Sequence, residues 1–215
     1  MKSCFAYLLL LLCCAPLAFG ATQQSEETKL PEVFSRLQNA AAETWSLSSD
    51  FVQEKHLAIF AETLLSKGHF SYQKPDHLRW ELLTPVPSGF VLRGQQGERW
   101  NGLSRETSVF RIDRDPIMGI IAEQLLAWAK VDIEWLKSRY QIELLSDQPV
   151  RLQLFPLDQG EAGFIEQLQI LFAVNNSHVK LVEMHEVGGD KTLLHFENAT
   201  MNQTLSAETF QAPEF

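Results

Sequence analysis

The stretch that decides the fold is GHFSYQKPDHLRW at residues 68–80, which continues into ELLTP at residues 81–85. Small or apolar residues alternate with polar ones on both sides of its proline. The small or apolar residues are Gly68, Phe70, Tyr72, Leu78, Trp80 and Leu82. A period of two places successive side chains on opposite faces of a β-strand, and Pro75 removes the amide donor that a continuous strand would need. The stretch therefore predicts two neighbouring strands, each with an aromatic and aliphatic face and a charged face.

This region resembles the LolA family of periplasmic lipoprotein carriers, in which a strand with a phenylalanine and a Gln-Lys pair precedes a glycine, a basic residue before proline, and a tryptophan. The matching positions are Phe51, Gln53, Lys55, Gly68, Phe70, Tyr72, Lys74, Pro75, Leu78 and Trp80. The resemblance covers residues 30–213, is carried by residues 51–85, and is supported by the strand count, the helix position and Phe210-x-x-Pro213. It implies an incompletely closed antiparallel β-barrel with helices over its open side.

Alternation with a period of two, interrupted by Gly, Pro and Asn turns, predicts about eleven strands. Their expected ranges are 47–56, 63–73, 77–83, 89–93, 97–100, 105–112, 140–145, 150–155, 164–174, 178–187 and 191–201. Residues 30–45 and 116–130 have helical spacing instead, with Pro31 and Pro116 suited to first turns. Antiparallel strands joined by short turns tend to curl into a barrel, and a helix inserted midway must cover its open end or lie inside. The expected fold is therefore mainly β (α+β), with an incompletely closed barrel and a helical lid in one domain at residues 30–215.

The N-terminal residues 1–20 have the features of a cleaved secretory signal: Lys2, a following apolar run, and the small-x-small site Ala18-Phe19-Gly20. All three cysteines, Cys4, Cys13 and Cys14, lie in this segment, so the mature chain would have no disulfide. Residues 21–29 are expected to be flexible. The chain has 27 acidic and 18 basic side chains, a balance that makes nucleic acid and anionic membrane surfaces poor partners. We therefore expect a soluble periplasmic protein.

A search of the sequence for catalytic chemistry returns little. The histidines, His56, His69, His77, His178, His185 and His195, lack the spacing of metal ligands. Asp113 and Asp115 are explained better as a turn residue and a helix cap than as a catalytic pair. The sequence has no phosphate-binding loop, dinucleotide motif or G-x-S-x-G, and it does not identify a nucleophile with a nearby base. We therefore expect no enzyme, no cofactor and no metal.

The helix expected at residues 116–129 is apolar over more of its surface than one buried face requires. It is either a helix that fills an ordinary core or a lid over a cavity. For a lid, the expected cavity lining is Phe51, Phe70, Trp80, Leu82 and Phe90 on strands, with Ile120, Ile121 and Leu125 on the helix. Any of the eight can equally be ordinary core. Gly119 would weaken the first turn of this helix and allow it to move.

Exposing a sixteen-carbon chain to water costs about 13 kcal/mol, at about 0.8 kcal/mol per methylene, so a carrier must enclose it. The LolA resemblance implies a monomeric carrier that takes acyl chains of lipoproteins, or of another lipid, from an inner-membrane exporter to an outer-membrane acceptor. It also implies a lid latch at Lys74, where the family has arginine, although lysine cannot make the planar two-bond contact of a guanidinium. The alternative is a non-carrier module on the same scaffold, such as a lipoprotein-sensing regulator.

Overall fold

One antiparallel sheet of eleven strands dominates the computed structural model, which describes residues 29–59 and 62–215. The expected signal segment 1–20 and residues 21–28 lie outside this part of the chain. The strands are β1 (Ser46–His56), β2 (Thr63–Gln73), β3 (His77–Thr84), β4 (Ser88–Arg93), β5 (Gln96–Asn101), β6 (Glu106–Arg111), β7 (Tyr140–Asp147), β8 (Val150–Pro156), β9 (Ile165–Phe172), β10 (Val179–Glu186) and β11 (Lys191–Met201). Their order in space is β6-β5-β4-β3-β2-β1-β11-β10-β9-β8-β7, so the edge strands β6 and β7 do not meet. The expected open antiparallel fold is confirmed.

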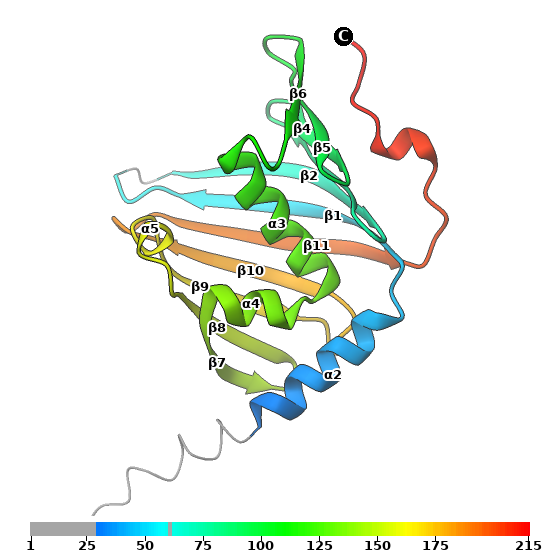
Figure 1. Ribbon diagram of the computed structural model, residues 1–215. Coiled ribbons are helices and arrows are strands. Elements are labelled where there is room, and N and C mark those ends of the chain that lie inside the picture. Colours follow the sequence, from blue (N-terminus) through cyan, green and yellow to red (C-terminus); the bar gives the residue numbers. More distant parts are fainter. Residues whose placement is uncertain (1–28, 60–61) are drawn as a thin grey trace, which may run out of the picture.

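The chain enters this sheet at its centre, not at an edge. From β1 it moves outward strand by strand to β6, crosses the sheet through two helices to β7, and returns strand by strand to β11. Strands β1 and β11 then pair with each other, with Phe51 opposite Phe196. Figure 1 shows the two crossing helices in front of the sheet, and they cover one of its faces.

The first described helix, α2 (Leu30–Ala42), begins at a first-turn proline and buries Val33, Phe34, Leu37 and Ala41. It ends three residues before the expected Trp45, and the cause lies at the other end of the chain. The Asn202 side chain accepts a hydrogen bond from the Trp45 N–H at 2.8 Å and donates one to the Glu43 carbonyl at 3.1 Å. These bonds hold the turn into β1, so the helix cannot continue.

The crossing segment contains α3 (Pro116–Lys130) and α4 (Ile133–Arg139). Asp115 caps α3 by accepting a hydrogen bond from the Met118 N–H at 3.2 Å, as its sequence position predicts. The helix ends where Val131 adopts a left-handed conformation, with φ of 52°. The sequence analysis did not predict α4, which Asp132 caps through the Trp135 N–H at 3.0 Å. It also missed the short helices α5 (Gln159–Ala162) and η1 (Ala207–Phe210).

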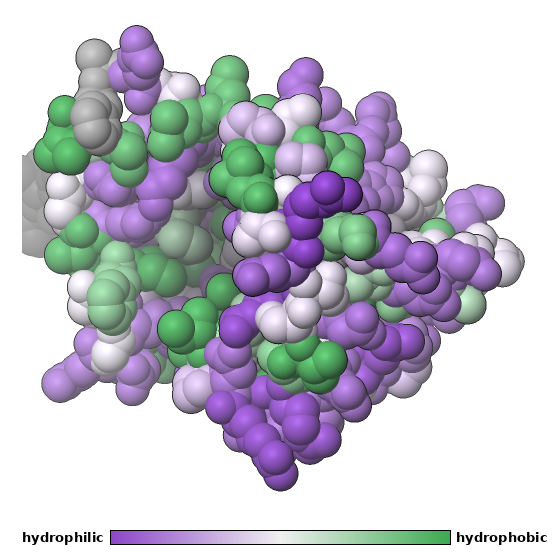
Figure 2. Space-filling model, turned by 90° about the horizontal axis from the view of Figure 1, so that it is seen from above, coloured by the Kyte–Doolittle hydropathy of each residue, from purple (hydrophilic) through white to green (hydrophobic). Residues whose placement is uncertain are grey.

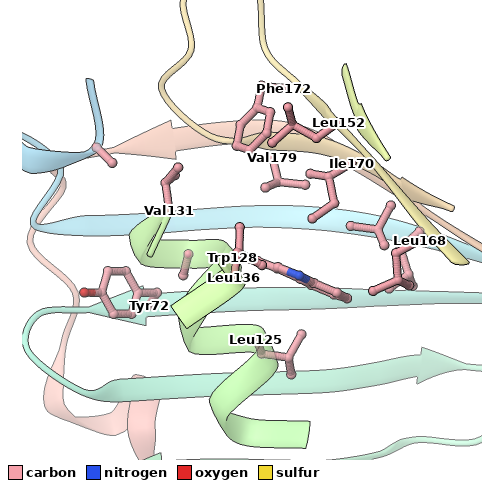
Figure 3. Close-up of a cluster of buried hydrophobic side chains, with 14 of the residues drawn as sticks. Tyr72, Leu125, Trp128, Val131, Leu136, Leu152, Leu168, Ile170, Phe172 and Val179 are labelled. Carbon is pink, nitrogen blue, oxygen red and sulfur yellow. The ribbon is translucent and has the colours of Figure 1, made fainter. Parts of the chain in front are cut away.

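The main hydrophobic core lies between the sheet and these helices. Figure 3 shows Leu125 and Trp128 of α3 and Leu136 of α4 close to strand residues such as Leu168 and Ile170, and all belong to one buried cluster. Along residues 29–59 and 62–215, every helix is too short or too polar to cross a membrane.

Candidate functional site

Four aromatic rings from neighbouring strands form the floor beneath α3. Phe51 of β1 stacks on Trp80 of β3, with ring centroids 3.9 Å apart and planes 17° from parallel. Phe196 of β11 lies against Phe51, Phe70 and Trp80, with centroid distances of 6.1–6.4 Å. Phe51 and Phe70 are buried, and Trp80 and Phe196 are partly buried against the same core. We call Phe51, Phe70, Trp80 and Phe196 the aromatic floor.

A glycine makes this stacking possible. Gly68 of β2 lies opposite Phe51 in the β1–β2 register, and a Cβ atom at Gly68 would lie 2.1 Å from the Phe51 ring. The same atom would lie 2.3 Å from the Glu81 carbonyl oxygen of β3. The glycine in the motif therefore has a steric role, since any side chain would overlap both the ring and a backbone group.

A small cavity lies between the aromatic floor and the C-terminal half of α3. Its volume is about 20 Å³, and its lining is Leu47, Ser49, Phe70, Leu125, Trp128, Ala129, His178, Val179 and Phe196. That volume suits about one water molecule. Pockets that take ligands of drug size or larger occupy roughly 300 Å³ or more. In this conformation α3 is therefore packed onto the floor, and this cavity would hold a long apolar ligand only if the helix moved.

Two polar groups in this region are buried without a hydrogen-bond partner among the described residues. One is the Trp128 indole N–H, from a side chain that lines the cavity, and the other is the Tyr72 hydroxyl. Burial, followed by the charge of Asp76, raises the pKa of Tyr72 to about 12. An unpaired buried donor costs about 1–3 kcal/mol, so a hydrogen-bond partner that reached either group would recover part of that cost.

Polar contacts near the surface hold α3 in place. Arg99 donates to the capping carboxylate of Asp115 at 3.1 Å, and Arg139 donates to Glu123 at 3.4 Å. These charged groups are partly exposed, and such pairs contribute about 0–1 kcal/mol each. Their small contribution means that apolar packing provides most of the free energy that holds α3 against the sheet.

One further chain of hydrogen bonds ties α3 to α5. The Gln124 side chain donates to the Tyr140 hydroxyl at 3.4 Å, and that hydroxyl donates to the Glu161 carboxylate. Burial raises the pKa of Tyr140, and the hydrogen bond to Glu161 raises it further, so the phenol keeps its proton as the donor. This chain of hydrogen bonds is a polar contact between α3 and the β8–β9 connection.

The family of the chain follows from comparison with known proteins. A model of the family described as outer membrane lipoprotein carrier protein LolA matches residues 42–213. The chain belongs to the LolA family. An outer-membrane lipoprotein carrier protein of Pseudoalteromonas translucida (strain TAC 125) is 20% identical over 179 residues, which cover 81% of this chain and 80% of that protein. The resemblance read from residues 51–85 is thus confirmed.

Solved structures share the fold of this LolA-family chain. An uncharacterized conserved protein from Thermus thermophilus matches with a TM-score of 0.55 and 9% identity, covering 86% of this chain and 94% of its own. MucB matches with a TM-score of 0.53 and 16% identity, covering 86% of this chain and 63% of its own. At these identities the likeness concerns the fold alone.

The structure separates the eight residues expected to line a cavity in this LolA-family protein. Phe70 and Leu125 line the small cavity, while Phe51, Trp80, Leu82 and Phe90 belong to the surrounding core. Ile120 and Ile121 instead lie on the outer side of α3, where they are 54% and 39% exposed. Neither of them lines the small cavity in this conformation. Trp128 and Phe196 do line it, and the sequence analysis named neither. Figure 2 shows hydrophobic side chains among hydrophilic ones on the upper surface, several of them beside a hollow.

Lys74 contacts α2, and Gly119 lies in close contact with the chain beyond β6. The Lys74 ammonium donates to the Ala42 carbonyl at 2.8 Å, so its hydrogen bond holds the C-terminal end of α2 rather than α3. A Cβ at Gly119 would lie 2.8 Å from the Ile112 carbonyl oxygen. This glycine therefore has a packing role, because it lets the first turn of α3 approach the end of β6.

The opposite face of the sheet holds a serine hydroxyl beside a histidine, a pair that the sequence analysis did not identify. The Ser48 Oγ and the His69 Nε2 lie 2.9 Å apart. The signal is weak in sequence, since the two residues are 21 positions apart and meet only through the β1–β2 register.

Proposed function

We propose that this protein is a periplasmic carrier that binds acyl chains of lipoproteins, or of another lipid, between α3 and the aromatic floor. The closed cavity over an aromatic floor carries this proposal, because an apolar helix held by weak polar contacts can move aside and uncover apolar surface on both sides. Membership of the LolA family supports it. The carrier would take its cargo at the inner membrane and pass it on at the outer membrane, and Lys74 would steady α2 while α3 moves.

The cost of opening α3 is met by the cargo itself. Moving the helix exposes apolar side chains to water, and a bound chain covers them again while losing its own contact with water. The affinity for cargo then depends on the difference between two large free energies, the cost of exposing the apolar side chains and the gain from covering them with the bound chain. This suits a protein that must both load and release its cargo. The α3 helix is the moving element in this proposal, and the strands under it stay fixed.

The unpaired Trp128 N–H suggests which part of the cargo lies deepest. The carbonyl oxygen of an ester or amide-linked acyl chain is an acceptor that could pair with this donor. A net hydrogen bond contributes about 1 kcal/mol, equivalent to about a fivefold change in affinity. We therefore place the acyl carbonyl beside Trp128 and the hydrocarbon tail along the aromatic floor.

A photo-crosslinking amino acid tests the site. At position 125, which faces the cavity, it should capture a bound fatty acyl probe in proportion to saturation. At position 120, which is 54% exposed on the same helix, it should capture little. Equal capture at both positions would place the chain elsewhere on α3. The absence of saturable probe binding would remove the carrier function itself, and the non-carrier module would then be the better explanation.

A Trp128→Phe variant tests the carbonyl contact. Competition against a fluorescent acyl probe should show that the unmodified protein binds methyl palmitate more tightly than a hydrocarbon of equal length. In the variant, the ratio of the affinity for methyl palmitate to the affinity for the hydrocarbon should fall about fivefold, because the variant keeps an aromatic ring but loses the donor. Trp45→Phe, a change at a side chain 40% exposed, should leave the preference unaltered. An unaltered preference in Trp128→Phe would show that the indole N–H does not contact the cargo.

A further inference from the structure

Three side chains on the outer face of β1 and β2 form a continuous chain of hydrogen bonds. The Ser48 Oγ lies 2.9 Å from the His69 Nε2, and the His69 Nδ1 lies 2.9 Å from the Asp50 Oδ1. Strand register creates this arrangement, because Asp50 pairs with His69 and Ser48 with Ser71, and all four side chains share one face. A serine, a histidine and a carboxylate joined in this order are the groups that activate a serine hydroxyl for attack on an acyl group, and geometry rather than sequence position identifies them.

The carboxylate of this chain is itself fixed. Asn198 of β11 donates to the second oxygen of Asp50 at 3.0 Å. This bond, together with the one from His69, lowers the pKa of Asp50, so the carboxylate is ionised at neutral pH. An ionised Asp50 accepts a hydrogen bond from the His69 Nδ1–H, and this tautomer leaves the Nε2 lone pair facing the Ser48 hydroxyl.

Ser48 and His69 face a groove about 650 Å³ in volume, which lies between the sheet and the C-terminal segment at residues 205–214. Figure 1 shows this segment beside the upper strands of the sheet. Arg79 of β3 anchors it by donating to the carbonyl oxygens of Thr209 at 3.2 Å and Gln211 at 2.8 Å. Ser48, His69, Ser71 and Arg79 all line the groove, so a bound molecule there would lie beside the serine.

We propose that this groove is a second site, on the face of the sheet opposite the aromatic floor, that hydrolyses carboxylic esters with Ser48 as the nucleophile. The Ser48 oxygen forms a bond to the ester carbonyl carbon as its proton passes to the His69 Nε2. The bond from that carbon to the alcohol oxygen breaks, and the alcohol leaves with the proton from His69. Water then attacks the acyl-serine in the same way and releases the carboxylic acid, so one ester and one water give one acid and one alcohol.

The surroundings set the class of ester. The Ser71 hydroxyl lies beside Ser48 in the groove and can face the negative charge developing on the carbonyl oxygen. The Arg79 guanidinium already donates to Thr209, Gln211 and Glu81. Backbone amides of β1 and β2 are engaged in the sheet, so turnover should be slow and should favour esters with good leaving groups. Carboxylates of Glu81, Glu208 and Glu214 also line the groove, and they favour neutral or cationic esters over anionic ones.

A fluorophosphonate probe, which labels activated serines, tests the proposal on the unmodified protein. Peptide mapping should find the label on Ser48. Ser48→Ala and His69→Gln should each lower labelling and hydrolysis of 4-nitrophenyl acetate by about 100-fold or more, as expected when a nucleophile or its base is lost. An anionic 4-nitrophenyl ester should be hydrolysed more slowly than the acetate.

Ser177 provides a matched control within the same chain. Its Oγ also lies 2.9 Å from a histidine nitrogen, the His178 Nδ1, but it donates its proton to the Asn175 side-chain oxygen at 2.7 Å. Ser177→Ala should therefore label and hydrolyse like the unmodified protein. Asp50 acts through His69, so Asp50→Asn should slow labelling and Asp50→Glu should restore part of it.

Two results would overturn the proposal. One is a label on a serine other than Ser48, or no label at all on protein whose circular dichroism shows it folded. The other is 4-nitrophenyl acetate hydrolysis by Ser48→Ala at the unmodified rate. Peptide mapping needs no substitution, so the proposal stays falsifiable even if a variant folds poorly.

Discussion

A Gly68→Ala variant should lose about 3 kcal/mol in its free energy of unfolding, at the upper end of what overpacking usually costs. The added methyl group would lie 2.1 Å from the Phe51 ring and 2.3 Å from the Glu81 carbonyl oxygen, and the second of these cannot rotate away. Urea denaturation followed by circular dichroism measures the change.

Gly163→Ala is the matched control for this change. Gly163 is the C-cap of α5 in a helical conformation, and the nearest atom to its added methyl would be the Gly160 carbonyl oxygen, 3.2 Å away. It should change stability by no more than about 1 kcal/mol. A double variant that also carries Phe51→Leu should recover part of the loss, since the smaller side chain gives the methyl group room on one side. A stable Gly68→Ala protein would mean that the aromatic floor is not packed as described.

Phe51→Ala should lower the free energy of unfolding by about 3–5 kcal/mol, because it removes a fully buried ring that stacks on Trp80. It should also increase the gain in melting temperature that a saturating acyl probe produces. A bound chain can fill the space left by the ring, as small apolar molecules fill engineered cavities. Differential scanning calorimetry with and without the probe measures both effects.

Phe210→Ala separates the two effects. Phe210 is 3% exposed and packs against His77, away from the aromatic floor, so its loss should destabilise the protein by a similar amount. The probe should raise the melting temperature of this variant by no more than it raises that of the unmodified protein. If Phe51→Ala and Phe210→Ala respond identically to the probe, the cargo does not contact the aromatic floor.

The strands and the start of α3 were predictable from the sequence because their signals are local. Alternation gave all eleven strands to within a few residues, and Asp115 with Pro116 gave the start of α3. The early end of α2 was not predictable, because it depends on Asn202, a residue 157 positions from Trp45. The helix α4 was missed because its seven residues are too few to show a helical period, although Asp132 was an available capping signal.

The candidate site was predictable only in part, for two physical reasons. The helix α3 is apolar on nearly all sides, so periodicity cannot say which face turns inward. Close packing of Gly119 against Ile112 helps to set that face, and it leaves Ile120 and Ile121 outside. The second reason is register, because Phe196 joins Phe51, and His69 joins Ser48, only once the partners of β1 are known. Alternation identifies the face of a residue but not its neighbour on the next strand.

The pairing of β1 with β11 also determines the order in which the fold can be completed. The chain makes the strands from β1 to β6 early in synthesis, whereas the strand that covers the other side of β1 is made last. Until β11 arrives, β1 presents a long unpaired edge that can join other chains, and the closing contacts span most of the polypeptide. Substitutions that slow the final docking of β11 should therefore increase aggregation during folding even where they leave the finished protein as stable as before.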